Sequence, residues 1–512
     1  MLSTNKSNAV PSWLRDLFYL GISLGIFYAL WIGHHALFTP DEGRYSEVAR
    51  EMVTTGDYIT PRVNGVAFLD KPALYYWLQA SAIHLFGLKE WALRFWPASI
   101  GILGTLVTYA AGRLLFNRRT GILSAIILAT SPLYYGAAHY ANLDLEVAAL
   151  IGITLLFSLL ALHTESSKNR SLFFIAAYIF CGLAALTKGL IGIAFPALII
   201  FIWMLFLNRF VLLKKMHLVL GFIIFTATTL PWYYLVQKAN PEFLHFFFVT
   251  QQFSRFLTTQ DFNNQAATWF YVPIVFGGFF PWSLFMIQAI IKSSKAIFKN
   301  RQQHTVELFL LLWFIIIFIF FSIPKSKTIG YIIPVFPALS LMVGHYLDAI
   351  WGKMWAKIIY GLIIMISAGS LIFSANASLL NHKSIKPIAL ELKPQLTSAD
   401  EVVTYYKYYQ DLPLYLERRI TIVADWSAPD IIKKDNWVRE LWFGMPFQDT
   451  KNWLIDENIF WQRWHSNKRL FVLMDQRNYA EFVKKAKTPV QAEGTYHDVI
   501  WVSNQPYHQT HT

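Results

Sequence analysis

The sequence contains one cysteine, Cys181, among 512 residues. A single cysteine excludes an intramolecular disulfide and a metal cluster built from thiolates. Cys181 lies inside an apolar run, where we expect a packed small side chain. Charged residues are also scarce, at 15% of the chain. So low a charge content argues for a membrane protein.

Hydrophobic residues make up 55% of the chain and fall in long blocks. Runs near or above the roughly 18–20 residues that cross a bilayer recur along the first three quarters of the sequence. We expect the first run to remain as an anchor, because no small-residue cleavage site follows it. The sequence therefore predicts a mostly α-helical, polytopic bundle of about eleven or more spans. The eleven runs lie at about 15–37, 93–115, 120–138, 144–163, 172–187, 190–207, 217–236, 268–291, 306–323, 329–347 and 356–375.

Short loops that carry Lys and Arg alternate with loops that do not. Because these cations are retained on the cytoplasmic side, the sequence predicts that loop 38–92, loop 237–267 and the C-terminal region lie outside the cytoplasm. The net charge of +13 is spread over the basic loops, so we interpret it as topology signal and not as nucleic-acid binding. The basic loops contain Lys6 and Arg15, then Arg113, Arg118 and Arg119, then Lys168 and Arg170, then Arg209, Lys214 and Lys215, then Lys292, Lys295, Lys299 and Arg301, and finally Lys353 and Lys357.

The composition changes near residue 377, where charges become frequent and short β-rich stretches appear, for example at 401–406. We predict a membrane domain over 1–376 and a soluble α/β domain over 377–512. The second domain has no GxGxxG or GxxxxGK(S/T) loop, so nothing there indicates a nucleotide site. Loop 38–92 is too long for a simple connection, and binding chemistry is expected in such loops.

Two acidic positions stand at the outer ends of predicted spans. Asp41 and Glu42 follow the first span with Arg44 nearby, and Asp144 opens the fourth span. Acids in these places suit a general base or a cation site. Helix capping is the competing explanation at both positions, because Asp at a helix start accepts hydrogen bonds from backbone N–H groups.

Outer-side cations form the next group of candidates. Lys71 follows Asp70 and precedes the aromatic residues Tyr75 and Tyr76, which could stack on sugar or prenyl groups. A snorkelling lysine beside an interfacial aromatic belt would give the same pattern. The positive-inside rule does not explain the other outer cations, and together they fit an anionic headgroup such as a phosphate. These other cations are Lys188, Arg255, Lys325 and Lys327.

In order and combination, several short motifs resemble those of the GT-C glycosyltransferases of the protein O-mannosyltransferase superfamily, particularly the bacterial lipid A aminoarabinose transferases. The motifs are at 40–45 (PDEGRY), 70–72 (DKP), 143–144 (LD), 186–189 (LTKG), 255–256 (RF) and 325–331 before Pro334. The resemblance implies inverting transfer of a sugar from undecaprenyl phosphate, or another polyprenyl phosphate, to an acceptor on the periplasmic side of the inner membrane.

The resemblance also implies roles for single residues. Asp41 is the leading catalytic candidate and Asp144 the second acid, while Lys71 and Tyr331 match positions that hold the carrier phosphate. Arg44, Lys188 and Arg255 are expected to join them as phosphate ligands. Accessory roles are expected for Glu42, Asp70, Tyr75, Tyr76 and Lys327.

The chain departs from its relatives at two places. Gln251 and Gln252 stand where some relatives have a zinc-binding His, and glutamine replaces imidazole poorly as a zinc ligand. We therefore expect no required cofactor, although a structural zinc at Asp70 stays open. Residues 326–331 read SKTIGY where close relatives have a GKLPTY-type run, so the tyrosine is kept in a different loop.

Three functions compete. The first is transfer of aminoarabinose or a related amino sugar to a lipid A phosphate, and the second is transfer of a hexose to protein or another glycan. The third is a transporter of lipid-linked sugars, which would place its acids near the bilayer midplane. We expect a monomer. Sugar and acceptor cannot be determined from the sequence, because selectivity depends on a few contacts in an unassembled pocket.

Overall fold

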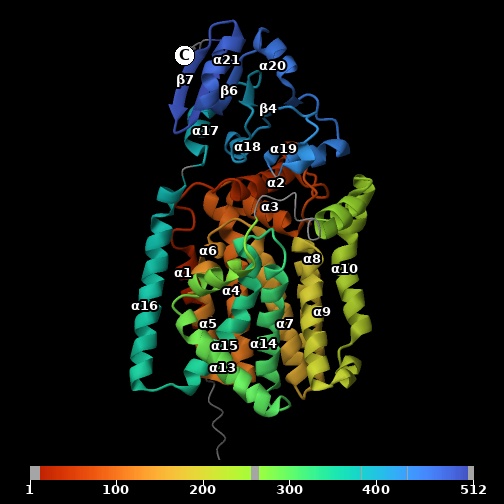
Figure 1. The fold of residues 1–512 in the computed structure, drawn as a ribbon, viewed down its shortest axis with the longest axis vertical. Helices are drawn as coiled ribbons and strands as arrows, with labels where there is room; N and C mark the ends of the chain where they lie inside the picture. Colours follow the sequence, from red (N-terminus) through yellow and green to blue (C-terminus); the bar gives the residue numbers. More distant parts are fainter. Residues whose placement is uncertain (1–11, 255–264, 382, 435, 506–512) are drawn as a thin grey trace, which may run out of the picture.

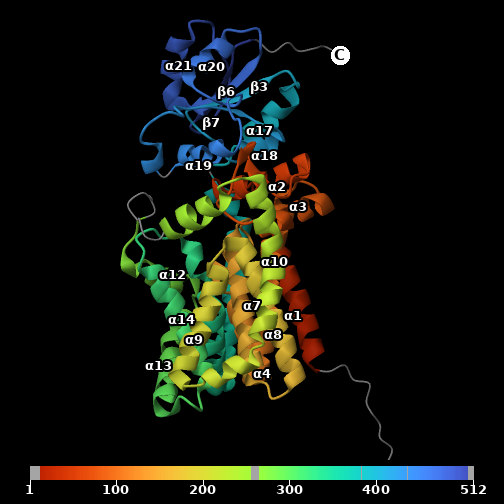
Figure 2. The same ribbon diagram turned by 90° about the vertical axis from the view of Figure 1, so that its right-hand side faces the viewer.

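The computed structural model describes residues 12–254, 265–381, 383–434 and 436–505. A long helical bundle carries a smaller α/β domain on one end (Figure 1). Helices α2 (Asp41–Thr55) and α3 (Leu74–Phe86) lie between the bundle and this domain in both views (Figure 2). The 38–92 segment thus forms a layer on the bundle, as expected for a helix that follows the membrane surface.

The chain is a multi-pass membrane protein. Seven described helices are long and apolar enough to cross a membrane, and two bent pairs raise the number to nine. Helices α1 (Ser12–Ala29) and α9 (Ile191–Leu207) fall on the two remaining apolar runs. The seven are α4 (Glu90–Leu115), α7 (Leu143–His163), α8 (Ser167–Lys188), α10 (Leu218–Ala239), α14 (Thr305–Ser322), η5 with α15 (Ile329–Ala349) and α16 (Lys353–Ala375). The bent pairs are α5 (Arg118–Ala129) with α6 (Pro132–Ala138), and η4 (Thr268–Phe270) and α12 (Tyr271–Gly278) with α13 (Ser283–Asn300).

Burial separates the central helices from the peripheral ones. In the most apolar 18-residue stretch of α7, 89% is buried inside the protein, whereas in the corresponding stretch of α16 only 17% is buried. A helix that is apolar all round and buried belongs in the core of the bundle. Helix α7 is therefore central, and α16 lies at the edge (Figure 1).

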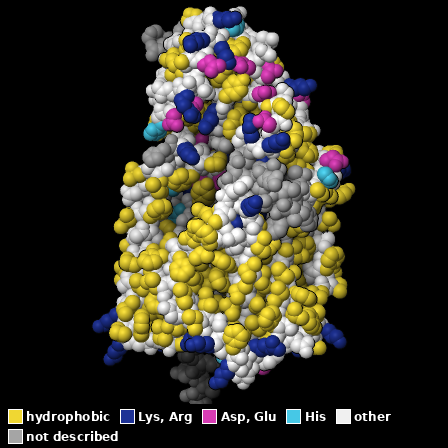
Figure 3. All heavy atoms as spheres, in the orientation of Figure 1, with side chains coloured by type: hydrophobic (Ala, Val, Ile, Leu, Met, Phe, Trp, Pro, Cys, Tyr) yellow, Lys and Arg dark blue, Asp and Glu magenta, His cyan; other side chains and the backbone are white. Residues whose placement is uncertain are grey.

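The surface of the bundle is a broad apolar band (Figure 3). Lys and Arg side chains gather at the end of the bundle away from the α/β domain, while the domain itself shows both signs of charge. This is the distribution that the alternation of basic loops predicts.

The C-terminal domain contains a six-stranded sheet in the order β5-β4-β3-β6-β8-β7. Strands β3, β4, β5 and β6 are parallel, and β8 pairs antiparallel with β6 and β7. Strand β3 falls on the β-rich stretch 401–406 seen in the sequence. The bounds are β3 (Glu401–Tyr405), β4 (Thr421–Val423), β5 (Leu454–Ile455), β6 (Leu470–Asp475), β7 (Gln491–Tyr496) and β8 (Val499–Ser503).

The two faces of this sheet are buried in different places, because side chains alternate along a strand. Val403 and Val472 pack under α20 (Glu457–Trp464) and α21 (Tyr479–Ala486). Val402 and Phe471 belong instead to a cluster that includes residues of α2 and α3. The C-terminal domain and the surface helices thus share one hydrophobic core.

Tight backbone approaches hold this junction. A Cβ at Gly43 of α2 would lie 2.8 Å from Cβ of Asp411, which precedes α18 (Leu412–Leu416). Gly444, at the end of α19 (Trp437–Gly444), packs directly against the carbonyl of Ala67. Glycine at both positions permits contacts that any larger residue would push apart.

Candidate active site

Seven of the predicted site residues line one cavity of about 340 Å³. The cavity lies where one end of the bundle meets the C-terminal domain (Figure 1). The seven residues are Asp41, Arg44, Asp70, Lys71, Asp144, Lys188 and Tyr331. Motifs separated by up to 290 positions are thereby brought together.

Asp41 faces the cavity at the start of α2. Pro40 occupies the cap position and makes no side-chain cap, so capping does not account for Asp41. Its Oδ1 accepts a hydrogen bond from Arg44 Nη2 at 2.5 Å, and its Oδ2 lies 3.4 Å from Asn142 Nδ2. The side chain keeps 32% of its surface exposed, which leaves the carboxylate accessible to a substrate.

The Asp144 side chain does not cap helix α7 either. Asn142 caps α7, because its Oδ1 accepts from the Asp144 backbone N–H at 2.9 Å. The Asp144 carboxylate instead forms an ion pair with Lys188, whose Nζ lies 4.3 Å from the centre of the Tyr331 ring. Gly330 packs directly against Asp144 Oδ2, so the loop before Tyr331 fixes this side of the cavity.

The C-terminal domain supplies the roof of the cavity. Arg44 pairs with both Asp41 and Glu440 of α19, and its guanidinium lies 4.9 Å from the Tyr45 ring centre. Reasoning from the sequence missed the roof, because all its candidates lay in the membrane domain and the C-terminal domain showed no nucleotide-binding loop. The sequence did contain a signal: Trp437, Arg439 and Glu440 follow closely after Asn436, which caps α19. The roof residues are Gln410, Asn436, Trp437, Arg439, Glu440 and Phe443.

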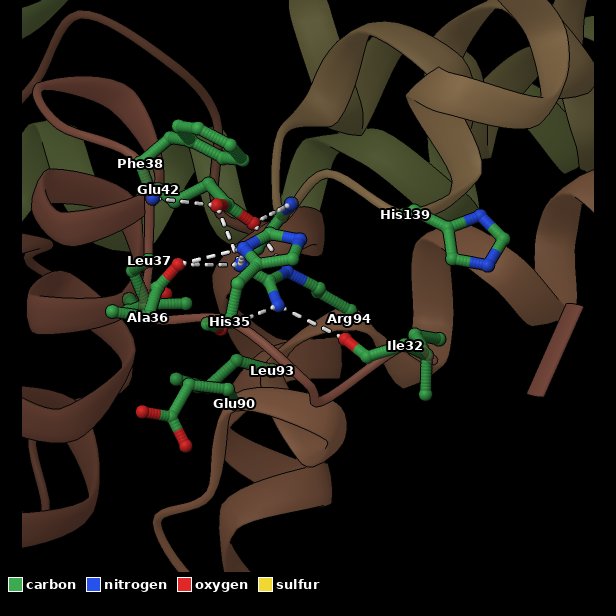
Figure 4. Close-up of polar contacts among 12 residues, drawn as sticks. Ile32, His35, Ala36, Leu37, Phe38, Glu42, Glu90, Leu93, Arg94 and His139 are labelled. Atoms are coloured by element: carbon green, nitrogen blue, oxygen red, sulfur yellow. Dashed lines mark hydrogen bonds and ion pairs between the residues drawn. The ribbon is translucent and has the colours of Figure 1, made fainter. Parts of the chain in front are cut away.

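Glu42 lies behind the cavity and not in it. Its carboxylate is fully buried and accepts from Arg94 Nε at 2.7 Å and Arg94 Nη2 at 2.8 Å (Figure 4). It also accepts from the backbone N–H of Ala141 at 2.6 Å and of Phe38 at 2.7 Å. Glu42 thus ties α2 to α4 and to the turn that leads to Asn142 and Asp144.

Three other accessory candidates do not line the cavity. Tyr75 and Tyr76 are fully buried against Tyr45, and burial raises the pKa of both hydroxyls. Lys327 is buried and donates to the backbone carbonyls of Ala266 and Pro324. Arg255 lies outside the described residues, so its role stays a prediction.

The charges of the cavity are balanced. Its lining includes four acids and four basic residues, which are Asp41, Asp70, Asp144, Glu440, Arg44, Lys71, Lys188 and Arg439. Such a site can hold an anionic group with its cations while carboxylates face a centre that gains positive charge. Among the described residues, no group of three or more His, Cys, Asp or Glu side chains is placed to hold a metal ion.

Two family profiles match the chain. Residues 70–235 match the dolichyl-phosphate-mannose-protein mannosyltransferase family, and residues 388–504 match the aminoarabinose transferase C-terminal domain. The first match covers cavity residues from Asp70 to Lys188, and the second covers the roof.

Several bacterial proteins are similar in sequence, all described as undecaprenyl phosphate-alpha-4-amino-4-deoxy-L-arabinose arabinosyl transferases. Proteins of this description from Proteus mirabilis and Erwinia tasmaniensis are 29% and 30% identical over 67% and 65% of the chain. These two matches span 60% and 58% of the relatives' own length. A second Proteus mirabilis protein is 28% identical over 82% of the chain and 76% of its own length.

Solved structures extend the likeness to the whole fold. ArnT from Cupriavidus metallidurans in the apo state superimposes with a TM-score of 0.82 at 25% identity, covering 96% of this chain and 98% of that one. The same protein bound to undecaprenyl phosphate gives 0.82 at 26% identity, covering 97% and 99%. An Archaeoglobus fulgidus oligosaccharyltransferase shares the fold alone, with a TM-score of 0.57 at 15% identity over 91% of this chain and 71% of that one. These matches confirm the resemblance seen in the motifs: the chain is similar to the GT-C glycosyltransferases of the protein O-mannosyltransferase superfamily and has an ArnT-like fold.

Proposed function

We propose that the protein is an inverting glycosyltransferase that moves a sugar from undecaprenyl phosphate to a phosphate of lipid A. The observation that carries the proposal is the convergence of Asp41, Asp144, Lys71 and Lys188 on one cavity at the outer end of the bundle. The relatives named above are described as arabinosyl transferases of an undecaprenyl-phosphate-linked aminoarabinose, which supports that sugar or a related amino sugar.

The charges suit the bond changes. Breaking the bond between the sugar and the carrier phosphate leaves negative charge on the phosphate and builds positive charge on the sugar ring. We assign Lys71, Lys188 and Tyr331 to holding the departing phosphate, and Asp41 and Asp144 to stabilising the ring; the lining of one cavity by all five residues supports this assignment. Arg44 stands between the two carboxylates Asp41 and Glu440, so we assign it to orienting Asp41 as well as to binding phosphate.

The chemical role of Asp41 depends on whether the acceptor group is a phosphate or a hydroxyl. A lipid A phosphate is already anionic at neutral pH, so its oxygen attacks without losing a proton and Asp41 mainly positions and stabilises. A hydroxyl acceptor would need Asp41 as a general base. We assign accessory roles in the cavity to Asp70. Glu42, Tyr75, Tyr76 and Lys327 are assigned supporting roles behind it.

The placement in the cell follows from the basic end of the bundle. We assign that end to the cytoplasm, with eleven spans, an outer layer at 38–92 and a periplasmic C-terminal domain over 377–512. The membrane is then the bacterial inner membrane, and the protein works as a monomer. An odd number of spans agrees with a cytoplasmic N-terminus and a periplasmic C-terminal domain.

The second candidate function is transfer of a hexose to protein or another glycan. The match of residues 70–235 to a protein mannosyltransferase family favours it. A transporter is the weakest alternative, because the acids line a cavity under the C-terminal domain and transport sites are expected near the bilayer midplane.

Mass spectrometry of lipid A tests the proposal in cells with the gene, without it, and with Asp41→Asn. We expect a sugar mass on lipid A that needs both the gene and Asp41, while the variant inserts and folds normally. Asp57→Asn is the matched control, because Asp57 belongs to the same outer loop and does not line the cavity. Unchanged lipid A would redirect the proposal to protein or glycan acceptors, and full transfer by Asp41→Asn would remove its catalytic assignment.

A further inference from the structure

A second cavity lies at the opposite end of the bundle, between α5 and α16, and has a volume of about 570 Å³. Its walls are apolar: Ile122 and Ile126 on α5, and Ile359 and Ile363 on α16. Each pair is spaced by four residues and therefore lies on one face of its helix. The mouth contains Arg118, Arg119 and Trp351.

Helix α16 does not close this space by packing. Only Ile359, Ser370 and Ser374 of its 23 residues are buried. Near its far end, Ser374 Oγ donates to Tyr135 Oη at 3.2 Å, so that end is attached to α6. A gap with hydrocarbon walls inside a membrane is filled by acyl chains, because no water there is stabilised by polar partners.

Arg119 at the mouth retains capacity for an anion, whereas Arg118 already donates through Nε and Nη2 to Asp16, both at 2.7 Å. Arg119 and Arg118 keep 54% and 53% of their side-chain surface exposed. Among the described residues, the Arg119 side chain makes one hydrogen bond, a long one of 3.2 Å to Asp348 Oδ1. Asp348 also accepts from Asn117 Nδ2 at 2.6 Å and from Thr120 Oγ1 at 3.2 Å, so its charge is shared.

The local charge favours an anionic ligand. Arg113 and Arg118 both pair with Asp16, and Arg119 pairs with Asp348. Three cations therefore face two carboxylates. The Arg119 guanidinium lies 5.3 Å from the Trp351 ring centre, a pairing of cation and aromatic typical of the membrane interface.

We propose that this groove binds one anionic phospholipid, with the phosphate at Arg119, the charge of Arg118 nearby, and the acyl chains between α5 and α16. Arginine binds phosphate through two parallel N–H groups, and basic pockets between spans on the cytoplasmic side are known lipid sites. The bound lipid fills the space between α16 and the bundle. The site is separate from the cavity that carries the proposed transfer and does not depend on it.

Native mass spectrometry of the purified full-length protein tests the site by titration with phosphatidylglycerol or phosphatidylcholine. We expect one phosphatidylglycerol to be retained in preference to phosphatidylcholine. In Arg119→Gln its affinity should fall by roughly fivefold, as expected for one surface cation. Arg301→Gln is the matched control, because it removes the same charge from an exposed position at the same end of the bundle and does not line the groove.

Equal retention of the two lipids by the wild type would overturn the proposal without any variant. An equal loss in Arg301→Gln would also overturn it, since the effect would then be one of overall charge. Competition by inorganic phosphate at the same concentration would show a free-anion site and would contradict a lipid site.

Discussion

Gly330 shows how strongly a single residue can control the cavity. It packs directly against the Asp144 carboxylate, which pairs with Lys188 beside Tyr331. A methyl group in this place must displace the carboxylate, the loop or both. Because Asp144 is assigned to the reacting sugar, even a small displacement changes the alignment on which transfer depends.

We therefore expect Gly330→Ala to lower transfer by about 100-fold, the usual cost of misplacing a reacting group by roughly 1 Å. Sugar transfer to lipid A, measured by mass spectrometry at equal protein levels, checks this. Gly369→Ala is the control, since a Cβ at Gly369 meets nothing within 4 Å. Equal activity of both variants would show that the loop does not fix Asp144.

The sequence identified Asp41 and Asp144 because each lies at the end of an apolar run, which is a local pattern. The sequence did not show whether these two acids cap helices. In the structure, the N-cap positions of α2 and α7 are occupied by Pro40 and Asn142. The pairing of Glu440 with Arg44 could not be predicted, because 396 positions separate the two residues. The burial of Glu42 was equally hidden, since Arg94 follows it by 52 residues.

At the scale of elements, the buried Glu42–Arg94 pair connects α2, α4 and the turn before α7. Both side chains are fully buried. Removing one member of a buried ion pair leaves the other charge without compensation. The positions of Asp41 and Asp144 depend on this connection, because Asp41 adjoins Glu42 and Ala141 precedes Asn142.

We expect Glu42→Ala to destabilise the protein by about 3–5 kcal/mol. Adding Arg94→Met to it should restore part of the loss, because no unpaired charge then remains buried. Thermal unfolding of both variants in detergent measures the effect, with Glu165→Ala, an exposed acid, as control. A double variant that is less stable than Glu42→Ala would contradict this explanation.

The junction between α2 and the C-terminal domain should be sensitive to pH. Burial raises the pKa of Asp411 from 3.8 to about 7, and burial beside Glu47 raises that of Glu51 from 4.5 to about 8. Both groups hold a proton in the folded protein at a pH where the unfolded chain releases it. Their contribution to stability is therefore complete below about pH 4 and is lost as pH rises through these folded values.

We expect the melting temperature of the wild type to fall between about pH 4 and pH 8. Asp411→Asn should flatten the part of that fall below about pH 7, because the amide does not titrate. Asp449→Asn, an exposed acid of the same domain, should leave the profile unchanged. A profile for Asp411→Asn identical to the wild type would show that Asp411 does not titrate in this range.

The positions of the membrane helices could be predicted from the sequence, because each apolar run is a continuous segment of the chain. Each apolar run falls on a helix or a bent pair. The bends were not predicted: Pro132 begins α6 after a break that turns the chain by 64°. The strand order of the C-terminal sheet could not be predicted from the sequence either, because strands that pair are distant in the chain.

For the whole molecule, the single buried Cys181 provides a direct test of orientation. In a Cys181→Ala background, we expect Asn467→Cys in the C-terminal domain to react with a membrane-impermeant maleimide in intact spheroplasts. Gln303→Cys, between α13 and α14, should react only after lysis, because that loop is assigned to the cytoplasm. The opposite labelling would invert the proposed topology.

The Arg44–Glu440 ion pair joins the first helix after the first span to a helix in the last fifth of the chain. During synthesis, the bundle and its two acids are in the membrane long before Glu440 leaves the ribosome. The cavity stays without its roof until the C-terminal domain has been made and has folded onto α2. Under the proposed function, the order of translation would act as a safeguard, because a chain that is still being made is inserted with an unfinished site and would not be ready to use a lipid-linked donor.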